Sequence, residues 1–187
     1  MIFVTVGGQM PFDRLIHAVD QWAKEHDRTD IFAQIGPTDC EPSFIKWVKY
    51  LDSAAFAGRL DSADAIISHA GMGTILSALY RAKPILVFPR RGDLMETRND
   101  HQVDTAKRFV EMGMVRAAYD ELELREELGR IDDLKQDRRI GPHASPELVT
   151  TLRDFINADP ETVRSRPASP VHATAPRDIS SSAAQPQ

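Results

Sequence analysis

Residues 67–79 read I-S-H-A-G-M-G-T-I-L-S-A-L and contain the pattern that decides the fold. A short apolar run ends at His69, two glycines follow at positions 71 and 73, and apolar residues then recur at helical spacing. This order of a buried strand, a glycine loop and a helix begins a strand–helix–strand unit with parallel strands. The stretch therefore predicts an α/β protein.

The same alternation continues along most of the chain. Residues 44–51 are compatible with a strand or with an exposed helix that carries Trp47 and Tyr50 on one side. The alternation predicts a Rossmann-like parallel sheet with helices on both faces. The expected strands cover residues 2–6, 31–35, 65–68, 84–88 and 114–118, and the expected helices cover residues 11–25, 60–64, 74–81, 99–112, 121–128 and 147–156.

Length and composition are those of one soluble globular domain. The chain has 187 residues, of which 42% are hydrophobic and 27% are charged. Residues 1–157 are expected to form the domain, and residues 158–187, rich in Pro, Ser and Ala, are expected to be a disordered tail. The net charge of −5 argues against nucleic acid as a partner.

The cellular compartment is expected to be the cytoplasm. The single cysteine, Cys40, excludes a disulfide framework and fits a reducing environment. The N-terminal residues lack the pattern of a signal peptide, and no apolar run approaches the roughly 20 residues that a membrane span needs.

Two glycine loops follow expected strands and precede expected helices. We call residues 7–9, G-G-Q, the first glycine loop and residues 71–74, G-M-G-T, the second glycine loop. A helix N-terminus presents unpaired N–H groups that bind anions, and glycine lets a phosphate approach the backbone closely. The alternative is that the turn geometry alone requires glycine.

Two common nucleotide motifs are absent. The P-loop pattern G-x-x-x-x-G-K-[ST] does not occur, and the first glycine loop continues as G-G-Q-M-P-F, which departs from G-x-G-x-x-G. A missing phosphate-binding lysine suggests a phosphate group that is held and not transferred. A diphosphate leaving group fits this description.

Three motifs in order carry a resemblance to a known family. They are S-H-A-G-M-G-T-I-L-S-A-L, K-P-I-L-V-F-P-R-R and E-T-R-N-D-H-Q, and the chain opens with V-T-V-G-G-Q-M-P-F-D-R-L. From Met1 to about Phe155 the chain resembles the C-terminal domain of family 28 glycosyltransferases. It is most similar to stand-alone subunits of the dolichol-pathway N-acetylglucosaminyltransferase type and to their bacterial counterparts in exopolysaccharide synthesis.

The resemblance implies the C-terminal, donor-binding half of a GT-B glycosyltransferase. Such a subunit would transfer a hexose, N-acetylglucosamine, glucuronate or similar, from a UDP-sugar to a polyprenyl-linked saccharide, with inversion. A membrane-associated partner would bind the acceptor and hold this chain at the cytoplasmic membrane surface. The alternatives are a non-catalytic activator of a partner glycosyltransferase and, from the same fold class, a nucleotide-sugar epimerase, which needs two such domains in one chain.

The resemblance also implies roles for both glycine loops. The backbone at Gly71, Met72, Gly73 and Thr74 would hold the donor diphosphate, and the Thr74 hydroxyl would either bind it or cap the helix. The first glycine loop would face the same cleft, with its side chain able to donate to phosphate or sugar. This loop consists of Gly7, Gly8 and Gln9.

Five further residues are donor-site candidates. His69, if protonated, would balance diphosphate charge and is a weak candidate for the catalytic base, which otherwise belongs to the partner chain. His101 and Gln102 would bind sugar hydroxyls. Arg90 would bind a diphosphate or a sugar carboxylate, or be a surface charge beside Arg91. Glu96 would contact the donor or be a solvated charge.

The remaining expectations concern metals, ribose and docking. The sequence holds no D-x-D motif or His/Cys cluster, so neither a metal nor a cofactor is expected. Ser77 stands where many relatives carry a ribose-binding glutamate. The charged helix near Glu121 and the C-terminal helix through Leu148, Leu152 and Phe155 are candidate partner-docking surfaces.

Overall fold

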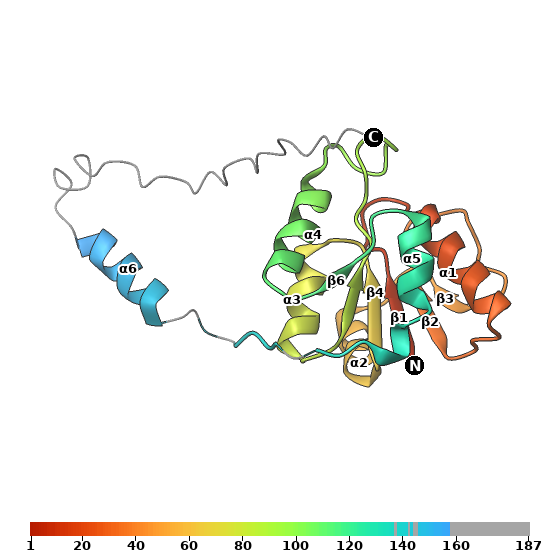
Figure 1. Cartoon of the computed structure of the whole chain (residues 1–187), viewed down its shortest axis with the longest axis horizontal. Coiled ribbons are helices and arrows are strands. Elements are labelled where there is room, and N and C mark those ends of the chain that lie inside the picture. The colour runs from red at the N-terminus through yellow and green to blue at the C-terminus, as the bar shows by residue number, and fades with distance from the viewer. Residues whose placement is uncertain (137, 142, 144–145, 158–187) are drawn as a thin grey trace, which may run out of the picture. The chain divides into compact units, whose positions relative to one another are not determined.

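The structure, a computed structural model, describes residues 1–136, 138–141, 143 and 146–157. The chain divides into two units, Met1–Pro142 and His143–Gln187. The first unit contains the sheet and its helices, and in the second the described residues form α6, Pro146–Asn157 (Figure 1). The helix expected over residues 147–156 is therefore present, whereas the tail expected over residues 158–187 lies outside the described residues.

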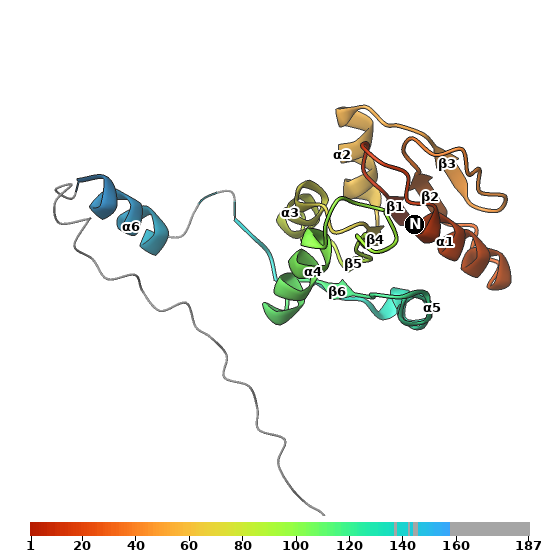
Figure 2. The ribbon, with the colours of Figure 1, turned by 90° about the horizontal axis from the view of Figure 1, so that it is seen from above.

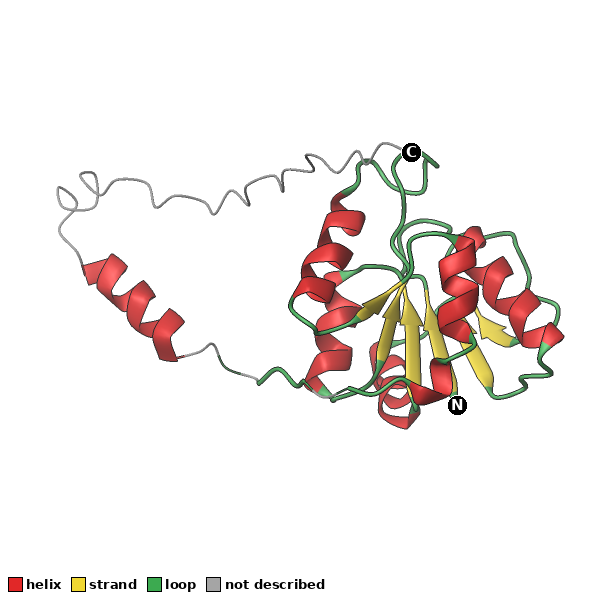
Figure 3. Ribbon diagram, viewed as in Figure 1, coloured by secondary structure: helices red, strands yellow, loops and turns green. Residues whose placement is uncertain are grey.

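The first unit is built on a six-stranded sheet whose neighbouring strands are all parallel (Figure 3). The strand order is β3-β2-β1-β4-β5-β6, which is that of a Rossmann fold. Residues 44–51 contain the edge strand, so the helical alternative for this segment was wrong. The strands are β1 (Ile2–Thr5), β2 (Ile31–Gln34), β3 (Lys46–Val48), β4 (Ala65–Ser68), β5 (Ile85–Val87) and β6 (Arg116–Ala117).

Helices cover both faces of the sheet, which confirms the predicted fold class. On one face α1 (Asp13–Glu25) and α5 (Glu121–Leu128) share an apolar cluster with the strands. The short 3-10 helix η1 (Ile131–Asp133) follows α5 in the chain and adds Ile131 to this cluster. Figure 2, which looks onto the carboxyl ends of the strands, shows these two helices apart from α3 and α4. The second cluster, on the other face, includes residues of α2 (Ser53–Ser62), α3 (Met72–Tyr80) and α4 (His101–Glu111).

The helix α2 is longer than expected. α2 begins at Ser53, seven residues before the expected start at residue 60. Asp52 caps this end of the helix, because its carboxylate accepts a hydrogen bond from the Ala55 N–H at 2.8 Å. Only Leu60 of this helix is buried, so the sequence lacks the apolar period that reveals a helix. On α5 Leu124 and Leu128 are buried in the core of the same unit while Leu122 is exposed, so partner docking through this helix stays a prediction.

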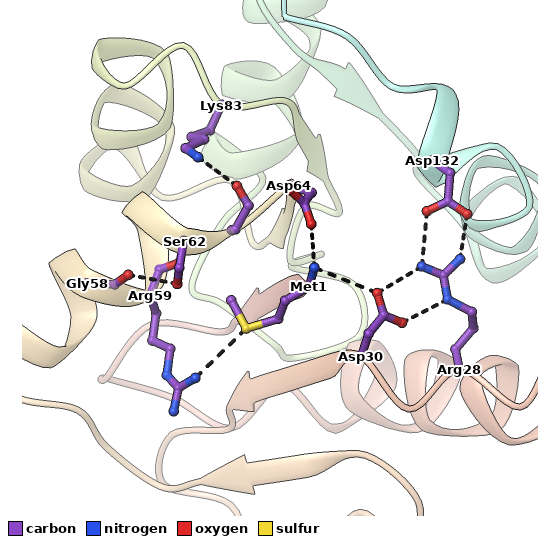
Figure 4. Close-up of polar contacts among 10 residues, drawn as sticks. Met1, Arg28, Asp30, Gly58, Arg59, Ser62, Asp64, Lys83 and Asp132 are labelled. Carbon is purple, nitrogen blue, oxygen red and sulfur yellow. Dashed lines mark hydrogen bonds and ion pairs between the residues drawn. The ribbon is translucent and has the colours of Figure 1, made fainter.

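Ion pairs lie where the strands begin (Figure 4). The amino group of Met1 contacts the carboxylates of Asp64 and Asp30, and Arg28 pairs with Asp30 at 2.9 Å and with Asp132 at 2.6 Å. This end of the sheet is occupied by the protein's own side chains, so the carboxyl ends of the strands are the place to look for a ligand site. Among the described helices, none has the length and apolar character needed to cross a membrane.

Candidate functional site

The two glycine loops lie side by side at the carboxyl ends of the central strands. β1 pairs with β4 so that Thr5 stands opposite Ser68, and each strand leads directly into one loop. From this point β1 connects toward β2 and β4 connects toward β5, the reversal at which open α/β sheets bind ligands. A cavity of about 140 Å³ opens here, lined by Val6, Gly7, Gly8, Gln9, Met10, His69, Arg90, Thr97, His101 and Gln102.

The His69 imidazole lies between the two loops and explains two of the glycines. A Cβ atom added at Gly71 would stand 2.2 Å from His69 Nε2, and one added at Gly7 would stand 2.8 Å from His69 Cε1. Gly7 also has a φ of +78°, which residues with a side chain rarely adopt. The protein's own packing therefore requires these two glycines. Gly73 differs, because an added Cβ would meet no atom within 4 Å.

His69 is neutral at physiological pH. Burial lowers the pKa of its imidazole to about 4, and the positive charge of Arg90 acts in the same direction. The Nδ1 atom is buried and has no hydrogen-bond partner among the described residues. The expectation of a protonated His69 that balances diphosphate charge is therefore not met in the free protein. The neutral ring lines the cavity.

This low pKa makes a prediction about stability. The unfolded chain takes up a proton at the ordinary histidine pKa of 6.5, whereas folded His69 takes it up only at about 4. The neutral, buried His69 therefore contributes fully to the free energy of unfolding above pH 6.5. As the pH falls toward 4 this contribution is lost, at a cost of up to about 3 kcal/mol. Urea denaturation of wild type and His69→Gln across this window should show the wild type alone losing this increment. A difference between the two that stays constant with pH would contradict the assignment.

The N-terminus of α3 presents free backbone donors. Its N-cap is Gly71, which has no side chain to accept them, and the first helical bond runs from the Ile75 N–H to the Gly71 carbonyl at 3.1 Å. The N–H groups of Met72, Gly73 and Thr74 therefore lack an intrahelical acceptor. The Thr74 side chain is buried and makes no capping bond among the described residues, so the capping alternative is not observed. Three N–H groups and the helix dipole together favour an anion.

Arg90 holds loops together and is not a surface charge. Its side chain is buried, and its terminal N–H groups donate to the carbonyls of Val6 at 2.8 Å, Met10 at 2.6 Å, Glu96 at 3.3 Å and Pro11. The expected contact of this guanidinium with a diphosphate or sugar carboxylate is therefore corrected, because its terminal N–H groups already have acceptors.

The neighbouring Arg91 is also engaged. Its guanidinium makes two hydrogen bonds to the carboxylate of Asp93, at 3.0 and 2.6 Å, on the surface. Neither arginine of the P-R-R motif presents a free fork to an anionic sugar.

Glu96 belongs to a buried ion pair. Its two carboxylate oxygens accept from Arg14 at 2.7 and 2.8 Å, and one of them also accepts from the Arg91 backbone N–H at 2.9 Å. Both charged side chains are only 12% exposed. The Arg14 guanidinium lies 4.1 Å from the centre of the Phe88 ring. Glu96 is therefore not a solvated charge, whereas its contact with the donor stays a prediction.

The turn before α4 places His101 and Gln102 at the cavity. Gln102 is buried, and its side-chain oxygen accepts from the Arg90 backbone N–H at 3.2 Å. His101 is exposed and its Nδ1 contacts the Asn99 side-chain oxygen. Both line the cavity with the first glycine loop, as the predicted sugar-binding role requires. Asp100 is the N-cap residue, but its carboxylate accepts from the Gly92 N–H at 2.8 Å and does not cap the helix.

Sequence reasoning missed part of the site. Met10 and Thr97 line the cavity, and Tyr50 lies 4.0 Å from the position of a Cβ added at Gly8. Arg14 is missed because its partner Glu96 is 82 residues away and nothing in the local pattern joins them. In the part of the chain that the structure describes, no group of His, Cys, Asp and Glu side chains is placed to hold a metal ion.

Comparisons with known proteins identify the family of the chain. The model of the glycosyltransferase family 28 C-terminal domain matches residues 1–147. The UDP-N-acetylglucosamine transferase subunit ALG13 of Cryptococcus neoformans is 46% identical over 65 residues, which are 34% of this chain and 30% of that protein. The match thus spans less than a third of that relative's length.

Solved structures with low sequence identity share the fold. The NMR structure of ALG13 aligns with a TM-score of 0.54 at 21% identity, over 84% of this chain and 96% of that one. MurG of Acinetobacter baumannii aligns with a TM-score of 0.57 at 18% identity, over 82% of this chain and 48% of that one. Because the family model covers most of the chain and includes both glycine loops, the chain belongs to the glycosyltransferase family 28 C-terminal domain family.

Proposed function

We propose that this chain is the donor-binding subunit of a two-component glycosyltransferase that transfers a hexose from a UDP-sugar to a lipid-linked saccharide. The observation that carries the proposal is the N-terminus of α3, where the N–H groups of Met72, Gly73 and Thr74 lack helical acceptors. These three residues do not line the cavity, but the N-cap Gly71 lies against His69, which does. A nucleoside diphosphate is the leaving group that suits these donors, since the relative from Cryptococcus neoformans is a subunit of a UDP-N-acetylglucosamine transferase.

The proposed chemistry places the charge that develops at this helix. As the bond from the sugar to the diphosphate breaks, negative charge grows on the diphosphate oxygens. Preorganised N–H groups stabilise this charge without reorganisation, and this stabilisation is the main contribution of this chain to catalysis. Gln102 and His101 orient the sugar through its hydroxyls, and the neutral His69 ring lines the same cavity. The acceptor is deprotonated by a base of the partner, and the transfer inverts the anomeric centre.

The preferred sugar in this proposal is N-acetylglucosamine. The relative from Cryptococcus neoformans is a UDP-N-acetylglucosamine transferase subunit. The case for glucuronate depended on free guanidinium groups, and the terminal N–H groups of Arg90 and the fork of Arg91 are already engaged. A neutral sugar therefore suits this site better than an acidic one.

The proposed partner supplies what a single Rossmann-like domain does not. A complete GT-B enzyme has two such domains with the reaction in the cleft between them, and the match to MurG covers 48% of that chain. The acceptor-binding half is therefore proposed to be a separate, membrane-associated chain. Through it this subunit is proposed to lie at the cytoplasmic face of the membrane and to act in exopolysaccharide synthesis.

Calorimetric titration tests the donor site. Wild type is expected to bind UDP and UDP-N-acetylglucosamine, and to bind UDP-N-acetylglucosamine more tightly than UDP-glucuronate. Gly73→Trp is expected to weaken binding by about tenfold or more, because the indole would occupy the space over the free N–H groups while the fold has room for it. The matched control is Gly58→Trp, at another site where an added Cβ meets nothing within 4 Å.

The alternative function, a non-catalytic activator, gives a different result in the same experiment. An activator needs no donor pocket, so neither the isolated chain nor its complex with the partner would bind UDP-sugars through this chain. If binding appears only with the partner and is lost in Gly73→Trp, the donor-binding proposal holds. If the complex binds donor equally well with Gly73→Trp, the proposal fails.

A further inference from the structure

Arg90 lies at the meeting point of three segments around the cavity. Its guanidinium donates to carbonyls of Val6, Met10 and Pro11, which flank the first glycine loop, and to the carbonyl of Glu96. Its backbone N–H donates to the side-chain oxygen of Gln102. One residue thus joins the end of β1, the loop before α4 and the first turn of α4.

The chemistry of this position is specific to a guanidinium. The side chain is 3% exposed, and its plane lies against Phe12 with 4.6 Å between Cζ and the ring centre. Four carbonyls arranged around one planar group match the fixed fork of arginine, whereas a lysine ammonium offers three N–H bonds from a single point. A carboxylate is not the direct partner, because the acceptors of this guanidinium are backbone carbonyls.

We propose that Arg90 is a positioning residue for donor binding. Its guanidinium fixes the first glycine loop and the turn carrying His101 and Gln102 in the conformation that encloses the cavity. This inference rests on the proposed function and adds to it a residue that need not touch the donor. Without the guanidinium, donor binding must itself order residues 7–12, and the cost appears as weaker affinity.

The test measures donor affinity and loop order in the same proteins. We expect Arg90→Ala to weaken UDP binding by about tenfold or more and Arg90→Lys to weaken it by a smaller factor. Hydrogen–deuterium exchange should accelerate in residues 7–12 and 96–102 and remain unchanged in β2 and α5. Arg81→Met is the matched control, because Arg81 also donates to a carbonyl and a carboxylate, at Ser77 and Asp61.

Chemical rescue separates positioning from a general loss of stability. Ethylguanidinium at millimolar concentration is expected to restore UDP affinity to Arg90→Ala, because it refills the position among the four carbonyls. Ethylammonium at the same concentration is expected not to do so. If Arg90→Ala does not fold, Arg90→Lys carries the affinity and exchange measurements.

The outcomes distinguish this inference from the proposed function. If wild type binds no UDP-sugar, alone or with the partner, both the proposed function and the positioning role of Arg90 are overturned. If wild type binds and the Arg90 variants bind within about twofold of it, only the positioning role is overturned. Faster exchange spread over the whole unit, without rescue by ethylguanidinium, would also overturn it.

Discussion

Glu96→Gln is expected to destabilise the protein by about 3 to 5 kcal/mol, the largest effect among the substitutions considered. Arg14 and Glu96 form two hydrogen bonds at 2.7 and 2.8 Å, and each side chain is 12% exposed. Removing the carboxylate charge leaves a largely buried guanidinium whose remaining counter-charge is the more exposed Glu121 carboxylate, 3.8 Å away. Urea denaturation at neutral pH measures the loss directly.

A double-mutant cycle attributes this loss to the pair. Arg14→Met together with Glu96→Gln is expected to cost less than the sum of the two single changes, because neither charge is then left without its partner. The control is Asp132→Asn, which breaks a surface pair with Arg28 whose carboxylate is 72% exposed, and it is expected to cost about 1 kcal/mol or less. Additive costs in the cycle, or equal costs for Glu96→Gln and Asp132→Asn, would contradict the assignment of a buried pair.

Gly71→Ala is expected to destabilise the protein by about 1 to 3 kcal/mol and to weaken donor binding. The added methyl group would stand 2.2 Å from His69 Nε2. The ring also lies against Gly7, where an added Cβ would stand 2.8 Å from His69 Cε1, so the first glycine loop limits the space around it. The imidazole is therefore displaced into the cavity or the second glycine loop shifts.

Gly73→Ala is the matched control for this prediction. It lies two residues away, its added Cβ meets nothing within 4 Å, and alanine favours a helix over glycine by up to about 1 kcal/mol. Thermal and urea denaturation should show a stability equal to or above that of wild type, while UDP affinity falls because the methyl group obstructs the phosphate. Equal stability of the two variants would show that His69 does not constrain the second glycine loop.

The fold could be predicted from the sequence because the four central strands, β1, β2, β4 and β5, are short, largely apolar and followed or preceded closely by glycine or proline. Residues 65–68, for example, are apolar enough to be buried on both faces, and the glycine loop that follows them predicts that a helix begins next. α2 was placed incorrectly because its buried surface is limited to Leu60, so it has no apolar period to detect. Residues 44–51, which contain the edge strand β3, could not be assigned to a strand or a helix from the sequence, because Trp47 at the centre of β3 also fits a helix face.

The candidate site could be predicted only in part. The glycine loops and the turn at His101 and Gln102 are local patterns; the sheet places the two loops at adjacent strand ends, and the first loop shares a cavity with the turn. The roles of Arg90 and Glu96 could not be predicted, because they depend on carbonyls and on an arginine about 80 residues away in the chain. A charged residue in a loop has the same local pattern whether it is solvated, ligand-binding or buried.

The most direct test of the central claim is an NMR titration of the ¹⁵N-labelled protein with UDP and, separately, with uridine. The account predicts that UDP shifts the amide resonances of Met72, Gly73 and Thr74 most strongly and that uridine leaves these three amides nearly unmoved. This difference isolates the diphosphate and places it at the N-terminus of α3. If UDP saturates the protein with its largest shifts elsewhere, such as between α1 and α5, the donor site is not at the second glycine loop and the account is contradicted.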